Sequence, residues 1–164
     1  MRVYKFLNKK YGLEALRDKR LKISNIMDLN DPFEFLGVEL SNKHDRRSFE
    51  GLKCHLSKKY GLLCFSESRK NPVQWAHYAE EYKGLCLGFD IPETNKNLLK
   101  VRYVENRFRS PKNKEDANNF MDKLLTRKFL HWKYEQEYRC FEPLRPKTNG
   151  FIINIFLSYL ILNR

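Results

Sequence analysis

The sequence lacks several patterns that would assign a function directly. Its 7 glycines form no glycine-rich phosphate loop of either common type, which argues against P-loop and Rossmann enzymes. Its 4 cysteines include no pair two residues apart and no Cys/His set with zinc-finger spacing, so no metal site is predicted. No complete catalytic triad can be read either, which leaves a hydrolase built on His77 as the least favoured alternative.

Long hydrophobic runs are also missing. Residues 1–8 contain no apolar stretch of the length that a secretory signal requires. The apolar segment Phe151–Leu162 is too short to span a bilayer. We therefore expect no membrane association and a reducing, cytoplasmic location.

Length and composition are those of one domain with one core. The chain has 164 residues, of which 41% are hydrophobic and 14% aromatic, so we expect a single folded domain over residues 1–164. Lys and Arg number 32 against 20 Asp and Glu, a net charge of +12 that attracts polyanions such as nucleic acid. The basic residues are spread along the chain, so a merely solubilising basic surface remains an alternative.

The hydrophobic pattern predicts strands and helices in an irregular order. Strands are predicted at Val3–Leu7, Leu21–Ser24, Gly61–Ser66, Leu85–Asp90, Val101–Val104, Tyr134–Phe141 and Phe151–Leu162. Helices are predicted at Tyr11–Lys19, His44–Lys59, Pro72–Lys83 and from Asn113 to Lys128, with a turn at residues 30–32 and a strand or loop at 33–40. This order favours an α+β fold, with central antiparallel or mixed strands flanked by helices, over a doubly wound sheet.

Charged and aromatic residues are densest in the run Trp132–Arg139. If Tyr134–Phe141 is a strand, Glu135, Glu137 and Arg139 point to one face, because side chains alternate along a strand. That face is either solvated surface, with Arg139 in a weak surface ion pair, or the floor of a polar cleft. The flanking aromatic residues favour the cleft and make both glutamates candidate catalytic groups.

Several segments together resemble a known family. They are Leu29–Glu34, Cys64–Ser68, Trp75–Asp90 and Trp132–Arg139, preceded by Tyr4-Lys5-Phe6. In order and spacing they resemble a large microbial family known only as a domain of unknown function, over about residues 4–141. After Gly150 the resemblance implies a strand, a helix and a short strand, whereas segment 151–164 is one apolar run. We therefore expect an atypical or truncated C-terminus whose apolar surface promotes self-association.

The layout of these motifs also resembles that of ADP-ribosyltransferases. The resemblance implies that the predicted α+β fold is an ADP-ribosyltransferase-like fold. The resemblance implies an NAD-binding cleft lined by Lys5 on the first strand, by Ser66 and Ser68, and by the two glutamates. Glu137 would stabilise positive charge as nicotinamide leaves, and Glu135 would activate the acceptor. The first strand departs from the class pattern, because it carries Lys5 where that class has Arg or His.

The remaining candidate residues each have a structural alternative. Ser66 and Ser68 end a buried strand, where they bind a ribose, order the glutamates or merely satisfy a turn. Trp75, His77 and Tyr78 lie on the Pro72–Lys83 helix. There His77 is either an acid or base oriented by Glu81 or a structural histidine with its hydrogen bonds satisfied. The aromatic residues either stack on a ligand ring or pack in the core. Arg139 binds a phosphate group or pairs with a glutamate.

The sequence therefore predicts an NAD-binding, ADP-ribosyltransferase-like enzyme with NAD as its substrate and no metal. The acceptor would be nucleic acid or protein, and the +12 charge favours nucleic acid. The alternative is a non-catalytic module that binds nucleic acid or another partner. Its binding would fall steeply with salt and would be indifferent to Glu137→Gln.

Overall fold

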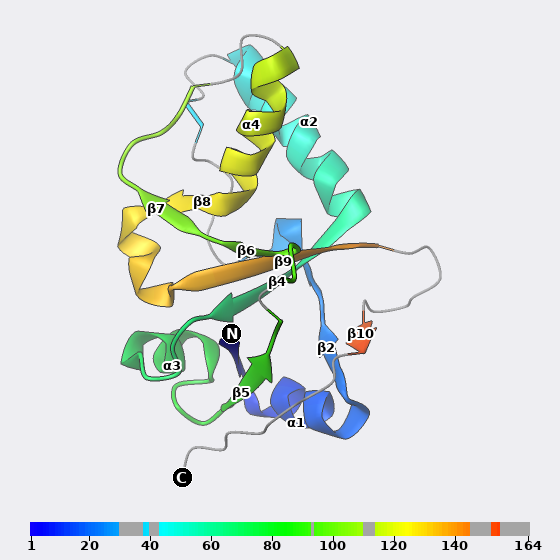
Figure 1. The fold of residues 1–164 in the computed structure, drawn as a ribbon, viewed down its shortest axis with the longest axis vertical. Helices are drawn as coiled ribbons and strands as arrows, with labels where there is room; N and C mark the ends of the chain where they lie inside the picture. Colours follow the sequence, from blue (N-terminus) through cyan, green and yellow to red (C-terminus); the bar gives the residue numbers. More distant parts are fainter. Residues whose placement is uncertain (30–37, 40–42, 93, 110–113, 145–151, 155–164) are drawn as a thin grey trace.

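A computed structural model of the chain has an α+β fold (Figure 1). It describes residues 1–29, 38–39, 43–92, 94–109, 114–144 and 152–154. The main sheet has six strands in the order β5-β1-β4-β9-β6, with the short β3 also paired to β4, and every pairing is antiparallel. These strands are β1 Arg2–Leu7, β3 Ser24–Asn25, β4 Tyr60–Ser66, β5 Leu85–Asp90, β6 Leu98–Lys100 and β9 Glu137–Pro143.

Helices and two strand pairs surround this sheet. The helices are α1 Lys9–Asp18, α2 Lys43–Lys59, α3 Pro72–Tyr78 and α4 Lys114–Thr126, with short 3-10 helices η1 Ile26–Asp28 and η2 Leu130–Glu135. Strand β2 Arg20–Lys22 pairs with β10 Ile152–Asn154, and β7 Arg102–Val104 pairs in parallel with β8 Arg127–Phe129. Figure 1 places α2 and α4 on one side of β9, and α1 and α3 beside β5 on the other.

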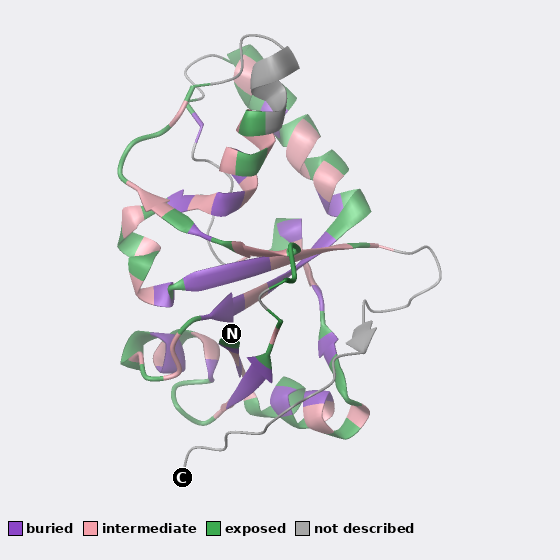
Figure 2. Cartoon of the chain, in the orientation of Figure 1, coloured by how far each residue is buried: buried purple, intermediate pink, exposed green. Residues whose placement is uncertain are grey.

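The central strands β4 and β9 lie between separate hydrophobic clusters. Leu63 and Phe65 of β4 pack with Val3 and other side chains of β1, β5 and α1. A second cluster joins Phe49 of α2 to Leu124 of α4. Figure 2 shows that burial continues along β4 and the first half of β9. The charged start of β9 is therefore enclosed by the fold, although its sequence is polar.

Local sequence signals explain where α3 begins. The side chain of Asn71 accepts a hydrogen bond from the Val73 amide at 2.9 Å, and Pro72 occupies the first helical position. The predicted start of this helix is confirmed. Its predicted end at Lys83 is wrong, because residues 80–82 have positive φ angles and the helix stops at Tyr78. Gly84 is required in the following turn, since a Cβ there would collide with the Leu7 carbonyl oxygen.

The prediction around the glutamates needs a larger correction. Residues Leu130–Glu135 form the 3-10 helix η2, Gln136 adopts a left-handed conformation with φ of 46°, and β9 begins only at Glu137. Glu135 is therefore not part of the strand. Lys128, predicted at the end of a helix, lies in β8, because α4 already ends at Thr126.

Other predicted elements are confirmed with shifted bounds. The buried strands at Gly61–Ser66 and Leu85–Asp90 appear as β4 and β5. The strand predicted at Leu21–Ser24 is divided between β2 and β3. The turn at residues 30–32, most of segment 33–40 and the end of the apolar segment, residues 155–164, lie outside the described residues.

Candidate functional site

A partly enclosed cleft lies beside the point where β1 meets β4. The register there pairs Tyr4 with Ser66, whereas β3 pairs with the other end of β4 at Leu62. The cleft has a volume of about 180 Å³ and is lined by residues of β1, β3, η1, β4, α3 and β8, by the last residue of η2 and by the first residue of β9. Its charged and hydroxyl-bearing lining consists of Tyr4, Lys5, Ser24, Asp28, Ser66, Tyr78, Lys128, Glu135 and Glu137.

Residues predicted from separate motifs meet in this cleft. Lys5 comes from β1, Ser66 from the end of β4 and Tyr78 from α3, and all three line the same space as Glu135 and Glu137. The pairing of β1, β4 and β9 explains this, because Tyr4 faces Ser66 and Ser66 faces Glu137 in adjacent registers. The antiparallel sheet thus brings the first strand, the serine segment and the second glutamate into one row.

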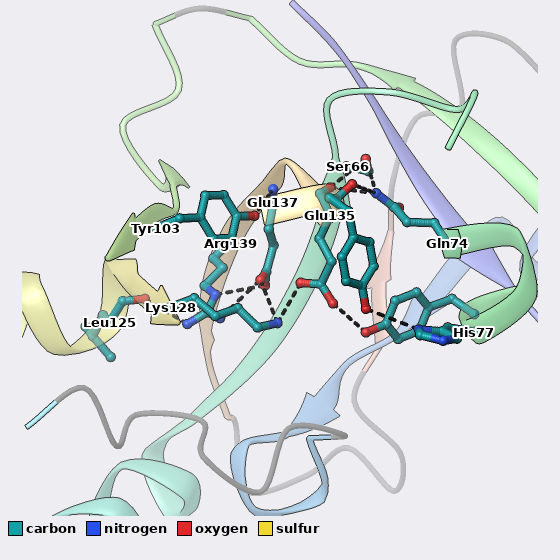
Figure 3. A network of polar contacts seen from close by, with 11 residues as sticks. Ser66, Gln74, His77, Tyr103, Leu125, Lys128, Glu135, Glu137 and Arg139 are labelled. Atoms are coloured by element: carbon teal, nitrogen blue, oxygen red, sulfur yellow. Dashed lines mark hydrogen bonds and ion pairs between the residues drawn. The ribbon is translucent and has the colours of Figure 1, made fainter. Parts of the chain in front are cut away.

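Glu137 is held by a buried arginine. Arg139 donates from Nε to Oε1 of Glu137 at 2.8 Å and from Nη2 to Oε2 at 3.1 Å (Figure 3). Arg139 has no exposed surface and Glu137 only 4%, so the alternative of a solvated strand face is wrong. Burial alone would raise the pKa of this carboxyl, but the charges of Arg139 and Lys128 outweigh it and lower the pKa of Glu137 to about 2.

Lys128 joins the two glutamates, and sequence reasoning missed it. Its ammonium group lies 2.6 Å from Oε2 of Glu135 and 3.2 Å from Oε2 of Glu137 (Figure 3). It also lies 4.8 Å from the ring centroid of Trp132. In the sequence this lysine continues the helical spacing of the preceding residues. The only available signal was its position in a basic, aromatic stretch just before the glutamates.

The two carboxyl groups have opposite pKa shifts. Burial raises the pKa of Glu135, the charge of Lys128 lowers it, and the negative charge of Glu137 raises it again, with a net upward shift. The Tyr78 hydroxyl donates to Oε1 of Glu135 at 2.5 Å, and burial together with this carboxylate raises the pKa of Tyr78. A pair whose environments separate the two pKa values is suited to one ionised group and one proton-transferring group.

Side chains from β4 and α3 fix the backbone that carries Glu135. The Ser66 hydroxyl donates to the Glu135 carbonyl oxygen at 2.8 Å, and Nε2 of Gln74 donates to the same oxygen at 2.7 Å. Asn71 donates to the Tyr134 carbonyl oxygen at 2.8 Å. Ser66 therefore orders the glutamate segment, one of the roles predicted for it. Gln74, only 2% exposed, was not predicted, and its position one helical turn before Tyr78 was the available signal.

Lys5 forms a basic wall of the cleft. Its ammonium group donates to the Cys64 carbonyl oxygen at 3.1 Å and lies 5.8 Å from the ring centroid of Phe65. Burial lowers the pKa of Lys5, while Cys64 and Glu137 act in the opposite direction. The Lys5 ammonium group is therefore near enough to Glu137 to feel its charge, without a direct ion pair to either glutamate among the contacts of the described residues.

The other predicted site residues lie around the cleft. Trp75 packs edge-on against Phe6 with ring centroids 5.3 Å apart, as expected for a core residue. Arg139 lies beneath the cleft in its contact with Glu137. Nδ1 of His77 is 3.1 Å from the Tyr134 hydroxyl, so the predicted pairing with Glu81 is replaced by this contact. Ser68 lines a separate, more open surface groove and does not line the cleft that holds the glutamates.

Metal and membrane features can be assessed for the described part of the chain. Among these residues, no group of three or more His, Cys, Asp and Glu side chains is placed to hold a metal ion. None of the helices in the described ranges combines the length and apolar character needed to cross a membrane.

A known protein family matches the part of the chain that contains the glutamates. Residues 74–140 match the model of DUF2971, a family of proteins of unknown function. The match runs from Gln74 to Cys140, so it includes Tyr78, Lys128 and both glutamates but not Lys5 or Ser66. No curated protein and no solved structure matches the chain. The DUF2971 match supports the predicted resemblance to an uncharacterised family and adds no named activity.

The ionised state of Glu137 should make the protein sensitive to acid. Its pKa of about 2 lies below the ordinary value of 4.5, so its stabilising effect is fully present above pH 4.5 and is lost as the pH falls toward 2. In urea unfolding, we expect the wild type to lose about 2 kcal/mol more between pH 5 and pH 3 than Glu137→Gln. Parallel pH profiles for the two proteins would contradict the low pKa.

Proposed function

We propose that the cleft binds NAD and that the protein is an ADP-ribosyltransferase-like enzyme. The observation that supports this proposal is the meeting of Lys5, Ser66, Glu135 and Glu137 in one cleft. These residues come from segments up to 132 positions apart in the sequence, and they were predicted from three separate motifs, the two glutamates from one of them. A chance match of short motifs would not require them to line the same space.

The dimensions of the cleft suit one end of a dinucleotide. Its volume of about 180 Å³ is below the ~300–1,000 Å³ of pockets that enclose a whole drug-sized ligand. We therefore place nicotinamide and its ribose inside, with the rest of NAD along the surface. Tyr4, Phe6 and Phe65 contribute aromatic surface to the lining, against which a planar ring can pack.

Glu137 would act on the bond that breaks. When the bond between C1′ of the ribose and the nicotinamide nitrogen opens, its electron pair leaves with nicotinamide and positive charge develops at C1′. A fixed carboxylate in a buried site stabilises such a charge more strongly than it would in water. Arg139 serves this step by keeping Glu137 ionised and oriented.

Glu135 would act on the acceptor. An acceptor hydroxyl or amine attacks C1′, forms the new C–O or C–N bond, and transfers its proton to the Glu135 carboxylate. The raised pKa of Glu135 makes it a better proton acceptor near neutral pH than an ordinary glutamate. Lys128 and Tyr78, each bonded to one oxygen of Glu135, fix the orientation of the carboxylate.

Release of nicotinamide from NAD tests the proposal. We expect the wild type to release nicotinamide, and Glu135→Gln to bind NAD normally but to transfer ADP-ribose about 10²–10⁴-fold more slowly. Glu81→Gln, an exposed site after α3, serves as the control and should behave as wild type. No nicotinamide release together with no NAD-dependent thermal shift would refute the proposal.

The alternative function is a non-catalytic module that binds nucleic acid. It is favoured by the fact that both oxygens of Glu137 already have partners in Arg139 and Lys128, as in a purely structural buried network. The net charge of +12 supplies the affinity for polyanions. Oligonucleotide binding that is unchanged by Glu137→Gln, in a protein without NAD turnover, would favour this alternative.

A further inference from the structure

The strand pair β7–β8 has one face toward the site and one face on the outside of the protein. Tyr103 and Lys128 are paired in the register and point toward the site, where the Tyr103 hydroxyl accepts from the Glu137 amide at 2.7 Å and Lys128 contacts Glu135. Because side chains alternate along a strand, the neighbouring residues point to the opposite face. That outer face carries Arg102 and Val104 of β7 and Arg127 and Phe129 of β8.

The outer face combines cations with exposed aromatic surface. Phe129 is 49% exposed, and its ring centroid lies 4.7 Å from that of exposed His131 at the start of η2. Arg102 is exposed and is paired in the register with Arg127, which is half-buried with its guanidinium carbon 5.2 Å from the ring centroid of Phe108. Segment 127–134 contains no acidic residue, and besides the buried Lys128 it carries Arg127 and the exposed Lys133. The like charges of the two arginines repel each other, and an anionic partner would offset this repulsion.

We propose that this surface, defined by Arg102, Arg127, Phe129 and His131, binds single-stranded nucleic acid. Single strands are held by aromatic rings on which bases stack and by cations that follow the phosphates. Phe129 and His131 provide the rings, and the exposed Arg102 provides the main cation beside the half-buried Arg127. A duplex hides the faces of its bases, so the exposed rings favour a single strand. That the bound single strand is the acceptor of ADP-ribose rests on the proposed function. That this surface binds a single strand does not.

The position of the surface relative to the cleft supports an acceptor role. Phe129 is followed directly by η2, the six residues Leu130–Glu135, which lead to the glutamates. Figure 1 shows β8 continuing through η2 to the start of β9. A 3-10 helix rises about 2 Å per residue, so η2 spans roughly 12 Å, the length of about 3 stacked nucleotides. A strand anchored on Phe129 therefore reaches the cleft with few intervening nucleotides.

Fluorescence anisotropy with a labelled 12-nucleotide RNA, the same DNA sequence and the matching duplex tests this inference. Phe129→Ala should weaken single-strand binding about 5- to 150-fold, the range expected when one aromatic ring that stacks on a base is replaced by alanine. Arg102→Gln should reduce the slope of log affinity against log salt by about 1. The matched control is Tyr11 on α1, which is 40% exposed with Lys22 5.2 Å from its ring centroid.

Tyr11→Ala and Lys22→Gln remove the same kinds of groups elsewhere and should change affinity less than about 2-fold. Tighter binding of the RNA than of the DNA, or the reverse, would show which of the two single-stranded nucleic acids this surface prefers. Equal losses at the two surfaces, equal affinity for the duplex, or no oligonucleotide binding would overturn the inference. Circular dichroism confirms folding of each variant. Nicotinamide release from NAD is measured without oligonucleotide, with water as the group that bonds to C1′, so failure of this inference and failure of the proposed function are distinguishable.

Discussion

Replacing Arg139 with leucine should destabilise the protein by about 3–5 kcal/mol, measured as the free energy of unfolding in urea at pH 7. Arg139 is fully buried, donates two hydrogen bonds to Glu137 and a third to the Leu125 carbonyl oxygen at 3.1 Å. Leucine fills much of the space but leaves a buried carboxylate that has lost its main counter-ion. The cost arises from that uncompensated charge more than from lost packing.

An exposed pair of the same geometry provides the control. Arg2 and Asp90 also form two hydrogen bonds, at 2.8 Å and 2.6 Å, but both side chains are 39% exposed. Arg2→Leu should therefore cost less than about 1 kcal/mol. Adding Glu137→Gln to Arg139→Leu should recover part of the stability, because the buried charge is then gone. Equal costs for the two arginines would contradict the buried ion pair.

Glu137→Gln should lower kcat for nicotinamide release by about 10²–10³-fold, with a small change in KM. Glutamine keeps the size of the side chain and removes its negative charge. If Glu137 stabilises charge that exists only in the transition state, the loss appears in kcat and in kcat/KM equally. Steady-state kinetics with NAD as the varied substrate measures both constants.

A nearby glutamate controls for general effects of charge. Glu67 directly follows Ser66, is exposed and pairs with Lys100 at 2.9 Å, but it does not line the cleft. Glu67→Gln should retain wild-type kcat. Assays must be run where urea unfolding shows both variants to be folded, since Glu137→Gln also removes the negative charge that faces Arg139. A folded Glu137→Gln protein with undiminished kcat would show that Glu137 has no catalytic role.

The fold was predictable where the sequence pattern is local. The apolar runs of β4 and β5 indicate buried strands, and Asn71-Pro72 marks the start of α3 through capping chemistry. The η2–β9 region was not predictable in the same way. Its alternating residues suggest a continuous strand, but Gln136 takes a left-handed conformation that separates Glu135 from β9. Tertiary packing, which periodicity does not report, decides this boundary.

In the candidate site, too, residues in local motifs were predictable and residues placed by tertiary contacts were not. Lys5, Ser66 and the two glutamates were proposed from motifs, and the structure gathers them in one cleft. Lys128 was not found because its role depends on β8 pairing with β7, a contact between segments more than 20 residues apart in the sequence. A residue whose role depends on contacts made only in the folded structure cannot be recognised from either local motif.

The most direct test of the account is to map where NAD binds, using amide chemical-shift changes in isotope-labelled protein. Binding in the cleft predicts the largest changes at Lys5, Cys64–Ser66 and Tyr78, and at the two glutamates. Glu67 and the exposed face of α2 should change little. Saturable shifts concentrated on the cleft residues would support the proposed donor site. No shifts, or shifts confined to basic surfaces such as α2, would contradict it.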